Sequence, residues 1–453
     1  MSELERAWSV EKTTIRAHAR CLVRLPSDQL KIVELRPGGS ISLGKFGAFF
    51  VDDVLGHKYG QTFEIVDDKK VIPVPGMTYT GSKDAEDDTA AAESADSAVA
   101  DDLIRLALKS GVNNQEIQDL GAEVQKLSNA DIEEMKKQGS SGQIGQAIID
   151  KIIQGHDSFE KKTVFSQQKY LKRKQQKFLR RFTIDYLGAS QVLQYYYGKD
   201  PGRVLDLSEE SLGIMMNYAN IMPGGNYLLV DETGGVILYA MLERMQGKGR
   251  VTVVHENEHP NHIVLNNSIF SAEAVDDMVK TINILNFFEP EVVVPWKELP
   301  EEEIEEYKPS KKQTYFRRKK RALELQTVVE IVKKGNFDGM IYASTLSPST
   351  AVPRFIEKIG GSRPIVVYSP YIEVVSELSH TVSKDLRVLA PSIIATRVRP
   401  YQTIPGRIHP LMSMRGGGGY VFWGTRVFPK EGITAIGRGR KKKKLNSEEP
   451  VEV

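Results

Sequence analysis

The second half of the chain alternates short, almost entirely apolar runs with segments of helical periodicity. The apolar runs are NYLLVDE, GRVTVVHE, FDGMIYAS and RPIVVYS, and the segments between them include VILYAMLERMQ, HIVLNNSIF and PRFIEKI. A strand with one face in water alternates polar and apolar residues, so these runs are typical of a parallel sheet covered on both faces. Helices between such strands provide the cover. We therefore expect a doubly wound α/β domain over residues 187–430, with a helix at 262–270.

The first 82 residues follow a different, strand-like pattern. CLVRL, KIVEL, SISLGKFGAFFVDDV and QTFEIV cluster or alternate apolar residues, and Pro37-Gly38-Gly39 and Gly56 supply turn signals between them. Short strands of this kind predict a small β-barrel or sandwich over residues 1–82.

Cysteine content and hydropathy indicate the compartment. The single cysteine, Cys21, cannot form an internal disulfide or a cysteine-rich zinc site. No apolar run is long enough to span a membrane, and the N-terminal residues lack the apolar core of a secretory signal. We therefore expect an intracellular protein with no membrane partner.

Charge is segregated along the chain, although 61 basic and 59 acidic side chains leave a net charge of only +2. Residues 84–102 contain eight acids and no base, so they cannot bury enough apolar surface to fold, and we expect a solvated loop over 83–102. The tail over 431–453 contains GRGRKKKK and an acidic tip. We expect this tail to be disordered and interpret it as a nuclear-import signal, which predicts a nuclear protein.

Residues 103–186 change to a helical period, and we expect a helical connector that contains a first basic block. The block runs from Lys161 to Phe182 and holds nine Lys or Arg residues without an acid. On a helix, Tyr170, Phe178 and Phe182 fall on one stripe. Nine like charges repel one another unless an anion is near, and phosphate is the anion we expect. The alternative is an amphipathic helix whose aromatic stripe is core and whose charges face water.

A second basic block ends a charged stretch within the α/β domain. Residues 298–321 begin with acids, in EEEIEE, and end with bases, in KPSKKQTYFRRKKR. Because apolar residues are scarce here, we expect a long exposed insertion or linker.

Two motif matches fail on their context. Gly39 to Lys45 fits G-x-x-x-x-G-K, but Phe46 replaces the Ser or Thr that would bind magnesium, and no helix follows. The stretch His255-Glu256-Asn257-Glu258-His259 fits the zinc signature H-E-x-x-H, which requires a helix, yet it follows a strand and precedes Pro260. His262 is available to complete a metal set, but a surface histidine is the simpler interpretation. We expect no metal site.

The junction after NYLLVDE has the layout of a nucleotide or S-adenosylmethionine site. The strand runs into Thr233-Gly234-Gly235 and a helix, and Glu256 lies at the end of the next strand. In such sites glycines let the backbone approach the ligand, and the acid binds ribose hydroxyls. A Gly-x-Gly-x-Gly spacing requires glycine at 233, 235 and 237, where this chain has Thr233, Gly235 and Ile237. Branched side chains fill the space of the ligand, so we interpret the loop as a degenerate site. The alternative is an ordinary strand-to-helix junction that tolerates Gly-Gly.

Several motifs together resemble one family. LGKFGAFFVDDVLGHKYGQTFEI, FSQQKYLKRKQQKF and PGGNYLLVDETGGVILYAMLERMQGKGRVTVVHENEHP are similar to the non-catalytic subunit of the eukaryotic tRNA (adenine-N1)-methyltransferase acting at tRNA position 58. VVYSPYIEVVSEL and RVRPYQTIPGRIHPLMSMRGGGGYVFWGT are similar to regions shared by that subunit and its catalytic paralogue. The likeness spans most of the chain except the acidic loop and the charged insertion.

The resemblance implies a Rossmann-like, methyltransferase-type domain with a degenerate cofactor site. Ala343 falls near the position at which the catalytic paralogue carries an aspartate that contacts the target adenine. The implied chain binds no cofactor itself, whereas a paralogous partner binds S-adenosylmethionine and transfers the methyl group. The resemblance further implies tRNA as a ligand and a heterotetramer of two such pairs. The residues of the degenerate site are Asp231, Thr233, Gly235, Ile237, Glu256 and Ala343.

The basic blocks are then the expected tRNA contacts, because phosphate contacts give sequence-independent affinity and aromatic rings stack on unpaired bases. Tyr170 or Phe178 is the expected stacking residue. The expected tRNA-binding residues are Lys169, Tyr170, Lys172, Arg173, Lys174, Lys177, Arg180, Arg181, Arg317, Arg318, Lys319 and Lys320.

Two other functions remain open. One is an active S-adenosylmethionine-dependent RNA methyltransferase with a divergent donor loop, which the presence of Glu256 favours. The other is a scaffold unrelated to RNA, whose basic runs are solvated faces. The run Gly416–Gly419 before Tyr420–Trp423 indicates either a hairpin at a subunit interface or a buried sheet edge.

Overall fold

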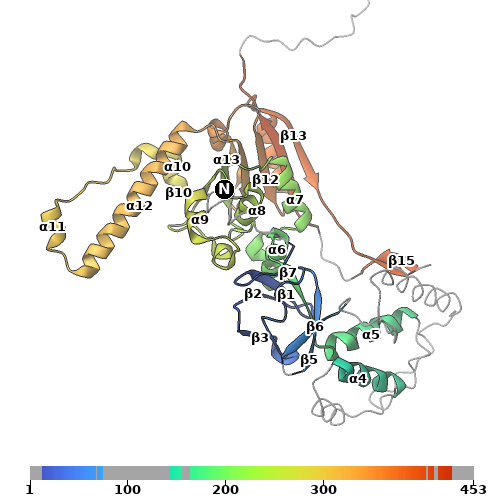
Figure 1. Cartoon of the computed structure of the whole chain (residues 1–453). Helices are drawn as coiled ribbons and strands as arrows, with labels where there is room; N and C mark the ends of the chain where they lie inside the picture. Colours follow the sequence, from blue (N-terminus) through green and yellow to red (C-terminus); the bar gives the residue numbers. More distant parts are fainter. Residues whose placement is uncertain are drawn as a thin grey trace, which may run out of the picture.

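The computed structural model describes residues 13–67, 69–74, 142–155, 164–404, 407–412 and 417–430. They form an N-terminal antiparallel sheet, a pair of helices beside it and a larger α/β domain (Figure 1). The predicted acidic loop 83–102, the stretch 103–141 and the tail 431–453 lie outside the described residues. No helix in the described ranges is long and apolar enough to cross a membrane.

The N-terminal sheet is open. Its strands run antiparallel in the order β2-β1-β7-β5-β6, so β2 and β6 are its edges, while β3 pairs with β4 in a separate hairpin. The predicted strands are confirmed, but a closed small barrel is not. The elements are β1 (Arg20–Arg24), β2 (Leu30–Glu34), β3 (Ser40–Ser42), the 3-10 helix η1 (Gly44–Phe46), β4 (Ala48–Phe50), β5 (Thr62–Asp67), β6 (Lys70–Val74) and β7 (Arg181–Tyr186).

The central strand, β7, comes from the end of the basic block. The prediction that this end is helical is wrong, because alternate residues of β7 face opposite sides of the sheet, as in any strand. Phe182 lies in the core, where its ring centroid is 4.4 Å from that of Phe49 and 5.7 Å from that of Phe63. Phe182 therefore does not continue the stripe of Tyr170 and Phe178.

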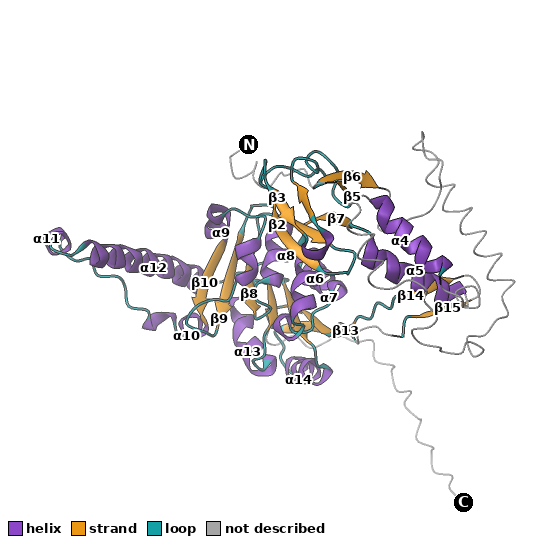
Figure 2. Ribbon diagram, turned by 90° about the horizontal axis from the view of Figure 1, so that it is seen from below, coloured by secondary structure: helices purple, strands orange, loops and turns teal. Residues whose placement is uncertain are grey.

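Two helices, α4 (Gly142–Gln154) and α5 (Val164–Phe178), pack against each other beside this sheet (Figures 1 and 2). Their shared apolar cluster is small, and partly buried Tyr170 packs against it. The buried members are Ile148, Ile149, Ile152, Phe178 and Leu179.

The α/β domain has a seven-stranded sheet in the order β10-β9-β8-β11-β12-β16-β13. The first five strands are parallel, and β16 is antiparallel to both of its neighbours. The predicted doubly wound α/β domain is confirmed. The strands are β8 (Asn226–Asp231), β9 (Arg250–His255), β10 (Val279–Asn283), β11 (Gly339–Ala343), β12 (Pro364–Ser369), β13 (Val388–Ala395) and β16 (Tyr420–Arg426).

Helices cover both faces of this sheet, which is why its strands are apolar on both sides. Tyr227 and Leu229 of β8 belong to one core, and Leu228 and Val230 belong to the other. The first core includes residues of α6 (Ala189–Lys199), η4 (Gly202–Val204), α7 (Glu209–Tyr218), α8 (Val236–Met245), η5 (Ile263–Asn267) and α9 (Ala272–Met278). The second includes residues of α10 (Ile284–Phe288), α12 (Pro309–Lys334), α13 (Pro348–Phe355), η7 (Ile356–Lys358) and α14 (Ile372–Ser383), and η6 (Pro290–Val292) follows α10.

The predicted helix over residues 262–270 is wrong in length and type, because only the short 3-10 helix η5 forms there. Ser268 ends it, and the Phe270 N–H donates to the Ser268 hydroxyl at 3.3 Å. Side chains of Asn and Ser compete with helical hydrogen bonds in this way.

The predicted exposed insertion over residues 298–321 is helical instead. After the short α11 (Glu301–Glu305), α12 begins at Pro309, where the missing N–H of proline costs nothing. Strong helix formers, among them Lys, Arg, Glu, Gln, Ala and Leu, supply most of its 26 residues. Val328, Val329 and Val332 are buried against the sheet, while the N-terminal half projects away from the domain (Figures 1 and 2).

The strand after the glycine run is an interior strand. Because β16 lies between β12 and β13, Tyr420–Trp423 form neither an interface hairpin nor a sheet edge. Gly419 has φ +79°, and a Cβ there would lie 2.5 Å from the Tyr368 ring, so no larger residue fits. A hairpin forms upstream, from β14 (Tyr401–Ile404) and β15 (Arg407–Pro410), and lies beside α5 in both views (Figures 1 and 2).

Candidate functional site

The expected cofactor residues gather at the carboxyl ends of β8, β9 and β11. Ligands of doubly wound folds bind at this edge, where the strand order reverses. Asp231 ends β8 and is paired in register with Ala343, which ends β11. Glu256 follows β9, the neighbouring strand on the other side. The structure therefore brings these strand ends together as the sequence pattern predicted.

The carboxylate of Asp231 closes the loop that follows it. Its Oδ1 accepts from the Thr233 N–H at 2.7 Å and from the Thr233 hydroxyl at 2.5 Å, and its Oδ2 accepts from the Leu238 N–H at 3.1 Å. Burial raises the pKa of Asp231, and the hydrogen bonds from Thr233 and Leu238 oppose that rise. These two N–H groups are thus bonded within the chain and are not offered to a ligand.

The glycines of the loop are covered by another segment of the chain. Gly234 and Gly235 have φ of +72° and +95°, and the Val264 N–H donates to the Gly234 carbonyl at 3.2 Å. A Cβ on Gly235 would lie 3.3 Å from the Cα of His262. The backbone of residues 262–264 therefore lies where a ligand would approach the glycines. Thr233 and Ile237, the two residues in place of glycine, are fully buried.

A carboxylate that sequence reasoning missed lies beside Ala343. Glu232 accepts from the Ser344 hydroxyl at 2.8 Å, and from the Thr345 N–H at 2.7 Å and its hydroxyl at 2.8 Å. The run from Gly339 to Ile356 has no acid of its own, so the acid arrives from the neighbouring strand. Its only sequence signal is its position directly after Asp231. Because these three donors already engage it, Glu232 holds the turn after β11.

Glu256, the expected ribose-binding acid, is solvent-exposed. Its backbone carbonyl accepts from the Asn283 side-chain amide at 3.0 Å. Among the described residues, none donates to its carboxylate. Glu256 therefore remains free to meet a ligand, although the loop opposite is closed.

The two rejected motifs lie where the sequence placed them. Gly39–Lys45 runs through β3 and η1 into β4, with no α-helix after it. The histidines of H-E-x-x-H flank a bend after β9, and each forms a hydrogen bond with a different partner. His255 Nδ1 bonds to the Asn257 carbonyl at 2.7 Å, and His259 Nδ1 bonds to Arg321 at 3.1 Å. In the described ranges, no group of three His, Cys, Asp or Glu side chains is arranged to hold a metal ion.

Among the α5 side chains that the structure describes, Tyr170 and Phe178 pack toward α4, whereas Arg173 and Lys177 are exposed. Phe178 is buried in the cluster with α4, so the prediction that it stacks on a base is wrong. Arg173 and Lys177 are exposed, Lys174 and Arg180 are half-buried, and the structure gives the backbone alone for Lys169 and Lys172. Tyr170 is half-buried against the same cluster, and Lys174 lies over its ring, 5.0 Å from the centroid.

Arg181 does not belong to an RNA-binding surface. It lies in β7 with only 6% of its surface exposed, and its Nε donates to a Glu64 carboxylate oxygen at 2.7 Å. A buried guanidinium is tolerated only with such a partner. The prediction for this residue is therefore wrong.

The second basic block lies on the projecting half of α12. Arg317 and Arg318 are exposed, and no described acid forms an ion pair with either. Lys319 pairs with Glu298, and Lys320 lies 3.9 Å from Asp276 and 3.6 Å from Glu324. Exposed pairs of this kind are weak, about 0–1 kcal/mol, so these lysines can exchange partners.

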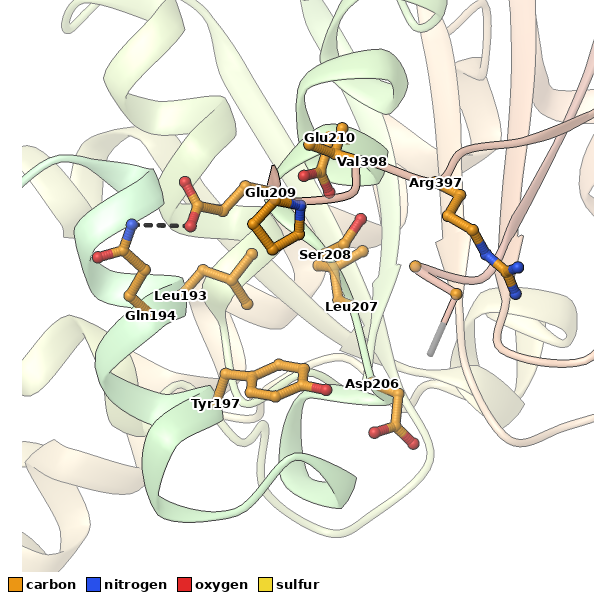
Figure 3. A pocket seen from close by; sticks show the side chains of 13 residues that line it. Leu193, Gln194, Tyr197, Asp206, Leu207, Ser208, Glu209, Glu210, Arg397 and Val398 are labelled. Atoms are coloured by element: carbon orange, nitrogen blue, oxygen red, sulfur yellow. Dashed lines mark hydrogen bonds between the residues drawn. The ribbon is translucent and has the colours of Figure 1, made fainter. Parts of the chain in front are cut away.

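Three cavities in the described part of the chain are lined by none of the residues Asp231 to Ile237, although His262, which covers Gly235, lines one of them. One of about 310 Å³ lies between α6, α7 and the chain around Arg397 (Figure 3). It is acidic, with Asp206, Glu209 and Glu210 in its lining, and Gln194 donates to Glu209 at 2.7 Å. Two others, of about 330 and 360 Å³, lie beside α12 and at the opposite edge of the sheet. Thr233, Ile237 and Ala343 line none of these three.

Comparison with known proteins gives consistent matches. The model of the Gcd10p family matches residues 14–315. The chain is 54% identical over 441 residues to the tRNA (adenine(58)-N(1))-methyltransferase non-catalytic subunit TRM6 of Debaryomyces hansenii, across 97% of this chain and 92% of that protein. It is 30% identical to the protein of the same name from Schizosaccharomyces pombe, across 95% of this chain and 96% of that protein.

Solved structures match more distantly. A SAM-dependent O-methyltransferase from Thermotoga maritima is 10% identical with a TM-score of 0.47, over 92% of this chain and 96% of that one. The tRNA (m1A58) methyltransferase TrmI from Aquifex aeolicus is 12% identical with a TM-score of 0.39, over 92% of this chain and 100% of that one.

Proposed function

Because this chain belongs to the Gcd10p family, we propose that it is the non-catalytic subunit of a tRNA (adenine(58)-N(1))-methyltransferase, as its relatives are named. A catalytic partner subunit then completes the enzyme. The names of the relatives support this reading and not the alternative of an active methyltransferase with a divergent donor loop.

One observation carries the proposal: the loop after β8 is closed by its own chain. Methyl transfer requires a bound donor held in line with the attacking nitrogen. In this chain the Asp231 carboxylate accepts hydrogen bonds from the N–H groups of Thr233 and Leu238, and residues 262–264 lie against Gly234 and Gly235. We therefore assign no S-adenosylmethionine to this chain and expect it on the partner. Glu232, the carboxylate beside Ala343, is held in the turn after β11 by Ser344 and Thr345.

The residues left to this chain suit docking of tRNA. Lys and Arg side chains that meet phosphates give affinity without sequence readout. The proposed surface includes exposed Arg173 and Lys177 of α5 and exposed Arg317 and Arg318 of α12. Lys169, Tyr170, Lys172, Lys174, Arg180, Lys319 and Lys320 remain in the proposal, whereas Arg181 and Phe178 are removed from it because both are buried.

We further propose that two such pairs assemble into a heterotetramer in the nucleus. Two copies of each subunit place two tRNA-docking surfaces beside two donor sites. The basic run GRGRKKKK at residues 437–444 has the composition of a nuclear-import signal.

Reconstitution tests the proposal. The chain alone, the partner alone and the pair are each incubated with labelled S-adenosylmethionine and unmodified tRNA. Only the pair is expected to label the tRNA, and transfer by the chain alone contradicts the proposal.

Docking is tested by the salt dependence of tRNA binding to the pair. Arg173→Ala with Lys177→Ala is expected to weaken binding to many tRNAs and to flatten the plot of log affinity against log salt by roughly 0.9 per lost duplex-phosphate contact. Lys384→Ala, at an exposed site after α14, is the control for loss of a charge. Unchanged binding by the α5 variant contradicts a docking role for that helix.

A further inference from the structure

A cavity of about 330 Å³ lies along the edge strand β10, between the carboxyl end of β9 and α12. Val275, Leu325 and Val328 supply apolar walls to this α12 cavity, and His255, Asn286 and Arg321 supply polar groups. Its volume falls within the range of small-molecule sites, about 300–1,000 Å³. At one end of the cavity, His255 and Asn283 are the last residues of β9 and β10, and ligands of doubly wound folds bind at the carboxyl ends of such strands. No residue of the closed loop from Asp231 to Ile237 lines it.

Three polar side chains in the lining, His255, His262 and Asn286, are uncharged and have unused hydrogen-bonding capacity. The His255 Nδ1 lies 2.7 Å from the Asn257 carbonyl, which can only accept, so Nδ1 carries the proton and Nε2 remains an acceptor. Burial lowers the pKa of His255, which keeps the ring neutral at physiological pH. Among the described residues, none forms a hydrogen bond with the Asn286 amide or with either ring nitrogen of His262.

The rim of the cavity is cationic and continues along α12. Arg321 lies at the rim, with its guanidinium 3.1 Å from His259 Nδ1. Arg317 is one helical turn further out on the same face, because residues four apart are neighbours on a helix. Within the described ranges, no acid forms an ion pair with Arg321 or Arg317.

Acids in the lining do not cancel this charge. Asp276 and Glu324 lie 3.9 Å and 3.6 Å from the Lys320 ammonium, and Lys280 in the lining supplies a second positive charge, so two cations offset these two carboxylates. Glu258, the remaining acid, lies 4.0 Å from His259 Nε2, at the mouth of the cavity. The net arrangement is a neutral polar floor, apolar walls and a positive rim.

A nucleotide matches that arrangement. A base is flat and apolar on its faces, carries donors and acceptors on its edge, and is joined to an anionic phosphate. A free nucleotide needs one cationic contact, whereas a row of arginines leading outward along a helix suits the successive phosphates of a strand. We propose that the α12 cavity receives one unpaired nucleotide of the tRNA, with its base between the apolar walls and its phosphates on Arg321 and Arg317. This inference rests on the proposed function and names a site for it.

Two cavity variants separate base contacts from phosphate contacts. In the full-length chain assembled with its catalytic partner, Asn286→Leu keeps the side-chain shape and removes the amide, and His255→Ala removes the acceptor. Each is expected to weaken tRNA binding about 3- to 10-fold, the effect of one lost hydrogen bond, without changing the salt slope. Arg321→Ala is expected to weaken binding and also to flatten the slope by roughly 0.7, the value for a single-strand phosphate. Wild-type tRNA affinity in both cavity variants, with unchanged thermal midpoints, overturns the cavity assignment.

Cross-linking of the unchanged protein covers the case in which the variants fail to fold. With tRNA containing 4-thiouridine or 6-thioguanosine, peptides over 255–262 and 279–286 are expected among the products. Cross-links confined to α5 and the outer half of α12 overturn the assignment.

Two further outcomes distinguish a tRNA nucleotide from a free nucleotide, and a failure of the cavity assignment from a failure of the proposed function. Titration with adenosine monophosphate alone is expected to show no saturable binding, and micromolar binding that Asn286→Leu abolishes would place a free nucleotide there instead. If the wild-type pair does not bind tRNA at all, the proposed function fails. If it binds and the cavity variants bind equally well, the cavity assignment alone fails.

Discussion

Thr233 donates twice to the same oxygen of Asp231, from its N–H at 2.7 Å and from its hydroxyl at 2.5 Å. The hydroxyl of Thr233 also accepts from the Ile237 N–H at 3.3 Å. Thr233 stands where a cofactor-binding loop has glycine, and its side chain takes part in the hydrogen bonds that close the loop. This relationship explains why substitution of the glycines goes together with a stable, fully buried loop.

The first prediction concerns the stability of that loop. Asp231→Ala leaves the Thr233 and Leu238 N–H groups buried without acceptors, each at a cost of about 1–3 kcal/mol. We expect the free energy of unfolding to fall by about 2–6 kcal/mol, measured by urea denaturation. Glu258→Ala, at an exposed site in the same region, is expected to change it by less than about 0.5 kcal/mol. Equal effects of the two changes would contradict the loop-closing role.

The second prediction concerns recovery of donor binding. Thr233→Gly combined with Ile237→Gly restores the glycine spacing, but residues 262–264 still cover the loop. We expect calorimetry to show no S-adenosylmethionine binding by this double variant. Micromolar affinity would mean that the branched side chains alone closed the site.

The third prediction concerns Arg181. Its buried ion pair with Glu64 ties β7 to β5 at 2.7 Å. Arg181→Ala leaves a buried carboxylate unpaired, and we expect a loss of about 3–5 kcal/mol in unfolding free energy. Because the side chain is buried, the salt slope of tRNA binding should match that of the wild-type protein when the variant is folded. A flatter slope would restore Arg181 to the RNA-binding surface.

The fourth prediction is a pH dependence that originates at His262. Burial lowers the pKa of His262 from 6.5 to about 4, and the charge of His255 acts in the same direction. The unfolded chain therefore binds this proton more tightly than the folded chain. The stability from this group is complete above pH 6.5 and is lost as pH falls toward about 4.

We expect His262 to contribute a decrease of about 3 kcal/mol to the unfolding free energy across that window. His262→Gln should remove this part of the slope, whereas His409→Gln, at an exposed site, should keep it. Identical slopes in the wild-type protein and the His262 variant would contradict the assignment.

Local sequence patterns predicted the strands of the α/β domain, because strands and helices alternate regularly along this part of the chain. The inner residues of β8, β9, β11 and β12 are almost all apolar because both faces of the sheet are buried, and the degenerate loop follows from residues 233 to 237 alone. The carboxyl ends of parallel strands meet at one edge, so the proximity of Asp231 and Ala343 also followed.

Long-range pairing decided the elements that local patterns missed. In the sequence, residues 181–186 continue a basic run with helical periodicity. In the structure they form a strand, in which Arg181 forms an ion pair with Glu64 and the Phe182 ring stacks on Phe49. The N-terminal half of α12 is strongly charged, whereas its C-terminal half carries the apolar residues Val328 and Val332, which pack on the sheet. Because the two halves differ in composition, the sequence did not reveal that they form one helix. Glu232 escaped notice because its partners, Ser344 and Thr345, are more than a hundred residues away.

Donor stoichiometry in the assembled enzyme tests the central claim most directly. The purified complex of this chain with its catalytic partner is titrated with S-adenosylmethionine, and bound donor is counted per pair of subunits. A closed loop after Asp231 predicts one donor per pair, and Asp231→Ala leaves that count unchanged. Two donors per pair, with one lost when the partner's site is blocked, would show that this chain binds the cofactor and would contradict the account.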